Sequence, residues 1–320
     1  MFKTIKVSTA IALLAVAAAP AAAQAAQSED SAQEVRAYWT PERMETAIPG
    51  DALLEGAEAA VPIGDLDLGL GTTQARRAQA TKVQNPSRKR YRKHGKVFFS
   101  DGGLRYVCSG TSARAKTKSL VLTAGHCTYS QSNGYVNNFM FVPAYKNDNA
   151  PFGRWTATDI KATNQWVGSE DIRYDVGMVT VGKLGRDKLA QRVGSRRLAF
   201  NKSGNLDYDV IGYPAAEPYD GESMYLCDTK AEGTDNRQKK PEPTRVDCPQ
   251  TGGSSGGGWV TNSGKLNSVV SYGYECALGG GLPIGLPFPT PPTCNNPEDG
   301  KLFGPYFGDV IKQLYRSQKR

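Results

Sequence analysis

The stretch Leu120–Cys127 (LVLTAGHC) joins a short apolar run to a turn that ends in histidine and cysteine. Its first half, Leu120–Thr123, has the aliphatic and β-branched composition of a strand. The chain contains two histidines, His94 and His126. His94 lies in a basic stretch that we expect to be removed or frayed. A single histidine is more often structural than catalytic, but this strand-to-turn setting makes His126 the candidate general base.

The second informative stretch is Thr251–Trp259 (TGGSSGGGW), in which glycines surround Ser255. Glycine allows a sharp turn that exposes a hydroxyl and leaves backbone N–H groups free to converge on an anion. We therefore expect Ser255 to be a nucleophile, with the backbone N–H groups of Gly253 and Ser255 as its oxyanion hole. A Gly/Ser linker has a similar composition. The nearby Cys248 and the apolar residues that follow the motif favour an ordered turn.

The motifs Thr-Ala-Gly-His-Cys (123–127) and Gly-x-Ser-Gly-Gly (253–257), in this order and well separated, resemble those of the trypsin/chymotrypsin family of serine peptidases. The doubled serine with a cysteine shortly before it resembles secreted bacterial members. The resemblance covers about residues 95–320. It implies an all-β fold of two six-stranded antiparallel β-barrels, with the histidine and an aspartate in the first barrel and the serine in the second. The active site would lie between the barrels.

The resemblance further implies an aspartate that starts an apolar strand between the two motifs. Tyr174–Val179 (YDVGMV) has this form, so Asp175 is expected to orient the histidine. Asp171 and Asp159 are the alternatives. In the same way Ser271, Tyr272 and Gly273 resemble the strand whose backbone pairs with an extended substrate, with tyrosine in place of tryptophan; these are the predicted substrate-binding residues.

Two positions depart from the family pattern. Ser254 stands where zymogens carry an aspartate that pairs with the new N-terminus, so activation by that ion pair is not expected. Pro249 stands where trypsin-like specificity requires an acid, so cleavage after Arg or Lys is not predicted. Asp247 is close in sequence, but the sequence alone does not show whether its side chain reaches the substrate pocket.

Six cysteines, an even number, favour disulfides in an oxidising compartment. Nearest-neighbour pairing gives Cys108–Cys127, Cys227–Cys248 and Cys276–Cys294, although six cysteines allow 15 connectivities. The loop Cys276–Cys294 is either part of the substrate pocket or a surface loop. No Cys-x-x-Cys or His-x₃-His spacing is present, so neither a metal nor another cofactor is expected.

The N-terminal part of the chain differs from the rest. Residues 1–26 place lysines before an apolar run and small residues, which is typical of a signal peptide. Residues 27–94 are predicted to be a largely irregular propeptide. It is acidic first, with ten Asp or Glu between 27 and 70, and then basic, with nine Lys or Arg between 76 and 96. We expect processing at the end of this basic stretch.

Short apolar runs separated by turn residues follow from residue 95 and are typical of β-barrels. We expect the first barrel at about 95–185, the second at about 198–305, and a helix at about 306–317, where Phe307, Val310, Ile311 and Leu314 recur at helical spacing. Residues 182–197 are polar and flanked by glycine, which suggests a connection between the two halves.

These observations predict a secreted serine endopeptidase that acts on polypeptides through an acyl-enzyme. We expect a monomer without nucleic-acid partners or membrane insertion after signal cleavage, located outside the cell or in the periplasm. An inactive homologue that serves as a secreted binding protein is the alternative. A module for anionic polymers is disfavoured because 26 Lys and Arg stand against 21 Asp and Glu from Val97 onward, a surplus of 5.

Overall fold

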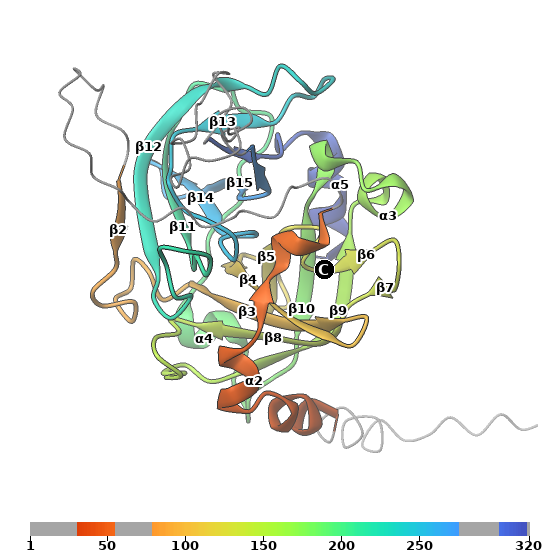
Figure 1. The fold of residues 1–320 in the computed structure, drawn as a ribbon, viewed down its shortest axis with the longest axis vertical. Helices are drawn as coiled ribbons and strands as arrows, with labels where there is room; N and C mark the ends of the chain where they lie inside the picture. The colour runs from red at the N-terminus through yellow and green to blue at the C-terminus, as the bar shows by residue number, and fades with distance from the viewer. Residues whose placement is uncertain (1–30, 55–78, 275–300, 319–320) are drawn as a thin grey trace, which may run out of the picture.

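The computed structural model describes residues 31–54, 79–274 and 301–318. The predicted signal peptide and the cysteines at 276 and 294 lie outside these ranges. Strands form most of the regular structure, and a helix ends the described chain (Figure 1), which confirms the all-β prediction. Within the described ranges, no helix has both the length and the apolar character needed to cross a membrane.

The first barrel is closed and contains six antiparallel strands. Its strands are β3 (His94–Asp101), β4 (Leu104–Ala113), β5 (Leu120–Thr123), β8 (Asn137–Pro143), β9 (Trp155–Ala162) and β10 (Gly177–Val181). They follow the order β4-β3-β8-β9-β10-β5, and β4 also pairs with β5, which closes the sheet on itself. A small hairpin, β6 (Tyr129–Ser130) with β7 (Gly134–Tyr135), extends from it.

The strand β8 is apolar from Phe139 to Val142 because both of its faces are buried there. In β8, Phe139 and Phe141 belong to the cluster inside the barrel, whereas Met140 and Val142 belong to a second cluster that it shares with the other half of the molecule. Successive side chains of a strand point to opposite faces. A strand between two cores therefore needs a continuous apolar run rather than an alternating one.

The second barrel contains seven strand segments, and β2 (Ala80–Lys82) pairs with one of them. The segments are β11 (Asp207–Gly212), β12 (Tyr225–Thr234), β13 (Thr244–Val246), β14 (Gly258–Thr261), β15 (Leu266–Val269), β16 (Tyr272–Gly273) and β17 (Leu302–Gly304). Their order begins with β15 and ends with β16. Because two residues separate β15 from β16, both ends of the sheet lie on one stretch of chain, and the sheet curls into a barrel-like form.

Short helices complete the fold. α3 (Asn164–Ser169) and η2 (Ile172–Tyr174) precede β10, and α4 (Leu189–Val193) lies in the predicted connection, where its two end residues are buried against the first barrel. α5 (Asp309–Gln318) confirms the predicted C-terminal helix. Its Ile311 and Leu314 pack into the core shared by the two barrels.

Residues 79–94, which we assigned to the propeptide, pack against the body of the fold. β2 adds to β12 of the second barrel, Val83 is buried, and Arg90 pairs with Asp209. His94 is not frayed: it is the first residue of β3, is 1% exposed, and lies 2.9 Å from the Thr111 hydroxyl. Burial and the neighbouring Arg196 hold its pKa well below the usual value, so its imidazole is neutral.

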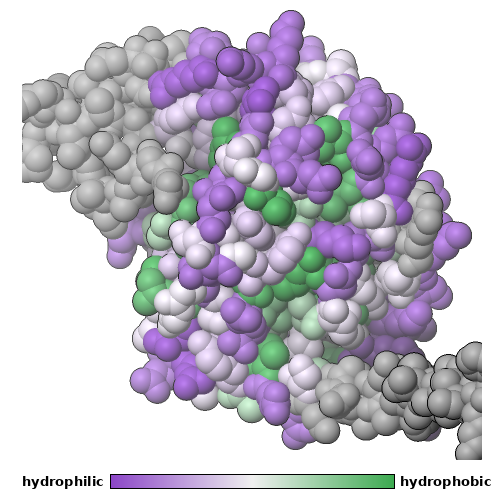
Figure 2. All heavy atoms as spheres, turned by 90° about the vertical axis from the view of Figure 1, so that its right-hand side faces the viewer, coloured by the Kyte–Doolittle hydropathy of each residue, from purple (hydrophilic) through white to green (hydrophobic). Residues whose placement is uncertain are grey.

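Residues 31–54, which we expected to be largely irregular, contain helix 31–38, α2 (Pro41–Glu45), β1 (Ile48–Pro49) and η1 (Gly50–Leu53). The segment runs across the strands of the first barrel (Figure 1), and β1 pairs in parallel with β4. On the face shown in Figure 2, hydrophobic groups are scattered in small patches among hydrophilic ones.

Candidate active site

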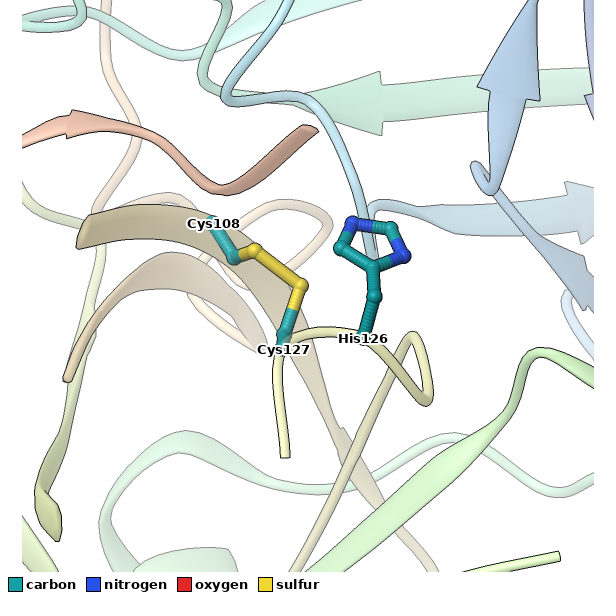
Figure 3. A group of neighbouring side chains, drawn as sticks. All are labelled: Cys108, His126 and Cys127. Carbon is teal, nitrogen blue, oxygen red and sulfur yellow. A yellow bond between two sulfur atoms is a disulfide. The ribbon is translucent and has the colours of Figure 1, made fainter. Parts of the chain in front are cut away.

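The turn that carries His126 is held from two sides. Gly125 precedes the histidine, and a Cβ atom there would lie 2.7 Å from Asp175 Oδ1 and 2.8 Å from the Trp166 ring, so only glycine fits. Cys127 follows it and forms a disulfide with Cys108 of β4, directly beside the imidazole (Figure 3). The strand β5 and this bridge therefore fix the position of the histidine.

Asp175 lies between η2 and β10, is fully buried, and contacts His126 with both carboxylate oxygens. Oδ1 accepts the backbone N–H of His126 at 2.8 Å, and Oδ2 lies 2.8 Å from its Nδ1. The Ser271 hydroxyl donates to Oδ2 at 2.5 Å. The alternatives are engaged elsewhere: Asp171 binds Arg173, and Asp159 contacts Gln318 and Lys161.

The electrostatic environment of His126 favours its protonated form. Burial disfavours the imidazolium and lowers the pKa of His126. The charge and hydrogen bond of Asp175 outweigh burial, and the charges of Asp51 and Glu170 also raise the pKa. The pKa of His126 is therefore raised above its usual value. Nδ1 faces Asp175, and Nε2 is buried without a hydrogen-bond partner among the described residues. The second nitrogen is thus the one available to take a proton.

The loop of Ser255 has backbone angles that require glycine. Gly253 and Gly256 have φ of +91° and +81°. A Cβ atom on Gly256 would lie 2.1 Å from Thr123 Oγ1, so the loop approaches the first barrel closely. Ser109 of β4 joins the two halves, because its N–H donates to Ser255 O and its hydroxyl donates to Gly253 O.

The Ser255 hydroxyl donates to Asp51 Oδ1 rather than to the histidine. The other carboxylate oxygen of Asp51 accepts the backbone N–H of Gly253 at 2.7 Å. Asp51 belongs to η1, so a residue of the N-terminal segment contacts both the predicted nucleophile and a predicted oxyanion-hole donor. Sequence reasoning did not find Asp51, because nothing local distinguishes it from the nine other acids of residues 27–70.

The three residues of the predicted substrate strand make different contacts. The Ser271 hydroxyl donates to Asp175 Oδ2, and the Ser271 carbonyl oxygen lies 3.5 Å from Ser255 Oγ. Tyr272 is buried, stacks on Phe303 and donates to Asp235, while Gly273 pairs with β17. Of the two positions that depart from the family pattern, Ser254 is fully buried and the Pro249 carbonyl accepts a hydrogen bond from the Tyr219 hydroxyl. The nearby Asp247 lies 3.4 Å from Lys301.

One group of side chains in the described ranges brings potential metal donors together: Cys108, His126 and Cys127. The two sulfurs form a disulfide (Figure 3) and lack the thiolate that binds a metal. The imidazole Nδ1 is occupied by Asp175. This group therefore does not fit a metal ion. The second described disulfide, Cys227–Cys248, confirms another predicted pair.

The comparisons agree with this geometry. No protein-family model matches the sequence. The solved structure of the protease Anisep from Arthrobacter nicotinovorans is 38% identical, with a TM-score of 0.62 over 71% of this chain and 95% of that chain. The chain belongs to the chymotrypsin-like serine protease family. The thermostable serine protease AL20, from an extremophilic microorganism, is 30% identical, with a TM-score of 0.61 over 71% of this protease and 97% of that chain.

Two further relatives are informative to a smaller extent. A Glu endopeptidase structure is 16% identical, with a TM-score of 0.57 over 75% of this protease and 97% of that chain, and shows the shared fold. A protein named extracellular metalloprotease, from Bacillus subtilis (strain 168), is 32% identical over 123 residues. The match spans 38% of each of the two chains. The extracellular location in this relative's name and the two disulfides of the present chain are both consistent with a secreted protein.

Proposed function

We propose that this protease cleaves peptide bonds through Ser255, His126 and Asp175. The observation that supports the proposal most is the pair of contacts between Asp175 and His126, which engage the backbone N–H and Nδ1 and leave Nε2 buried without a partner among the described residues. A bond from Nδ1–H to a carboxylate fixes the tautomer in which Nε2 is the acceptor. His126 is therefore the general base.

The chemistry then follows in two stages. Ser255 Oγ attacks the substrate carbonyl carbon as its proton passes to His126 Nε2, and the oxyanion that forms accepts the N–H groups of Gly253 and Ser255. The C–N bond breaks when Nε2 returns the proton to the amine, which leaves an acyl-enzyme. Water repeats the sequence and releases the acid. Asp175 orients the imidazole and stabilises the imidazolium in both stages.

A serine substitution tests this mechanism with a matched control. Ser255→Ala should lower kcat by several orders of magnitude, because a group of the triad acts as a unit with the others. Ser254→Ala is the control: this neighbour is equally buried, and its hydroxyl has no partner among the described residues. We expect near-normal kcat in the control. Hydrolysis of a peptide substrate measures both, and normal kcat in Ser255→Ala would refute the mechanism.

We further propose that the protease is exported by residues 1–26 and matures by loss of an N-terminal propeptide. The packing of residues 79–94 favours a cut between residues 54 and 79 over one near residue 94, because β2 and the buried Val83 and His94 belong to the folded body. N-terminal sequencing of the active secreted form measures this. A mature chain that begins near residue 95 would contradict the inference from packing, and one that retains residues 31–54 would contradict maturation itself.

A further inference from the structure

The N-terminal segment 31–54 is fastened to the body by side chains that behave as core residues. Trp39 and Met44 are each 1% exposed and belong to the cluster shared by the two barrels. The Trp39 indole donates to Asn138 O at 2.7 Å, and its ring packs against Phe98 at 5.4 Å between centroids. Burying two large apolar side chains provides affinity that does not depend on the covalent link to the rest of the chain.

Beyond this anchor the segment approaches the active site as a strand. β1 pairs in parallel with β4, with Ile48 opposite Tyr106 and Pro49 opposite Val107. Gly50 follows β1 and lies close to the disulfide, because a Cβ atom there would be 2.6 Å from Cys108 Sγ. Glycine is therefore needed for the chain to pass the disulfide and to place the next residue, Asp51, over the Ser255 loop.

Asp51 occupies the two catalytic groups that a tetrahedral intermediate would use. One carboxylate oxygen accepts the Gly253 N–H, where an oxyanion would bind, and the other accepts the Ser255 hydroxyl. The proton of the nucleophile is thus directed away from His126, whose Nε2 has no partner among the described residues. Charge-assisted hydrogen bonds of this kind are stronger than neutral ones.

We propose that residues 31–54 are an inhibitory ligand of the active site, that the Asp51 carboxylate is its decisive group, and that the segment still binds after it has been cut from the protease. The proposal rests on the proposed function of Ser255 and adds the regulation of that site. The partner of this surface is therefore a peptide with an apolar Trp/Met anchor and one carboxylate placed over the nucleophile.

The chemistry of the contact explains why the segment inhibits instead of reacting. The group presented to Ser255 Oγ is a side-chain carboxylate, and an anionic carboxylate is not an electrophile for acyl transfer. No backbone carbonyl is required at the oxyanion hole, because Asp51 Oδ2 already occupies the Gly253 N–H. We therefore expect the bound segment to remain uncut at Asp51.

The first experiment measures the rate at which a covalent probe labels Ser255 in the uncleaved chain. A fluorophosphonate probe labels activated serines, and a denaturing gel separates cleaved from uncleaved protease in one sample. We expect slow labelling of the uncleaved wild type and labelling about 10- to 100-fold faster in uncleaved Asp51→Asn, which keeps the shape but loses the charge. Glu45→Gln removes the same charge at an exposed position of the segment and should label as slowly as the wild type.

The second experiment adds a synthetic peptide of residues 31–54 to the mature protease. We expect inhibition that competes with substrate and is about 10- to 100-fold weaker for the Asp51→Asn peptide, but unchanged for the Glu45→Gln peptide. Absence of inhibition by the wild-type peptide would overturn the claim of binding after cleavage.

The outcomes separate this proposal from the proposed function. Labelling of the mature protease together with equal, slow labelling of uncleaved wild type and Asp51→Asn would overturn the role of Asp51. A mature protease that is never labelled would instead overturn the role of Ser255. Fast labelling of uncleaved Glu45→Gln would assign the effect to the overall acidity of the segment and would also refute the specific role of Asp51.

Discussion

At the scale of single residues, the site is organised around one fully buried carboxylate. Asp175 contacts the backbone N–H and the ring Nδ1 of His126 and accepts the Ser271 hydroxyl, so three partners stabilise this carboxylate at a fully buried position. Buried charges need such partners. The charge of Asp51, which contacts the Ser255 hydroxyl, raises the pKa of the same imidazole in the same direction as Asp175 does.

The pKa of His126 should therefore depend on the N-terminal segment. A negative charge favours the imidazolium and raises the pKa, so Asp51→Asn should lower the pKa of His126 in the uncleaved chain. NMR titration of the imidazole, with Ser255→Ala in every variant to prevent self-cleavage, measures this. Glu45→Gln is the control and should leave the pKa unchanged. An equal pKa in the Asp51→Asn variant would contradict the expected electrostatic contact.

At the scale of elements, the two described disulfides lie beside the two segments that carry the proposed base and nucleophile. The bridge Cys108–Cys127 ties the histidine turn to β4, and Cys227–Cys248 ties β12 to the chain that leads into the serine loop. Their sequence separations are 19 and 21, so they restrict the unfolded chain to nearly the same extent. They differ in how close they lie to the catalytic groups.

Removing either bridge with paired Cys→Ala substitutions should lower the free energy of unfolding by about 3 kcal/mol. Loss of the bridge at Cys127 should reduce kcat more, because this cysteine directly follows His126, whereas Cys248 precedes Ser255 by seven residues. Urea unfolding and peptide hydrolysis measure the two effects, and each double variant is the control for the other. Equal losses of kcat would show that the first bridge has no special role in placing the imidazole.

At the scale of the whole molecule, one apolar core joins both barrels, the N-terminal segment and α5. It contains Trp39 from the segment, Met140 from the first barrel, Ile211 from the second and Ile311 from the helix. The site lies where the barrels meet, and Ser109 crosses this boundary with hydrogen bonds to the serine loop. Packing of the shared core and the alignment of the catalytic groups are therefore coupled.

A substitution in α5 tests whether this helix belongs to the common core. Ile311→Ala should cost about 2–5 kcal/mol of unfolding free energy, because it opens a cavity at a fully buried position. The exposed Gln313→Ala on the same helix is the control, with an expected change within about 0.5 kcal/mol. Chemical denaturation measures both. A small loss for Ile311→Ala would mean that the helix is not part of the common core.

The sequence by itself predicted the all-β class and the family, because these depend on local composition and on motifs that are contiguous in the chain. Nearest-neighbour pairing also predicted the two disulfides that the structure describes. Leu120–Thr123 is apolar since both of its faces are buried, and the glycines around Ser255 are required by local backbone angles. The three catalytic roles stay predictions from the sequence. The contact between Asp175 and His126 supports two of them, whereas the Ser255 hydroxyl binds Asp51.

Only the tertiary structure decided where the N-terminal residues lie. The pairing of β2 with β12 and the burial of His94 join residues far apart in the chain, and no local pattern encodes such contacts. The same holds for Asp51, which is separated from Ser255 by 204 positions and is one of ten acids in a stretch without distinguishing neighbours. Its effect arises from its position, because a carboxylate inhibits a nucleophile only when the fold places it within hydrogen-bonding distance.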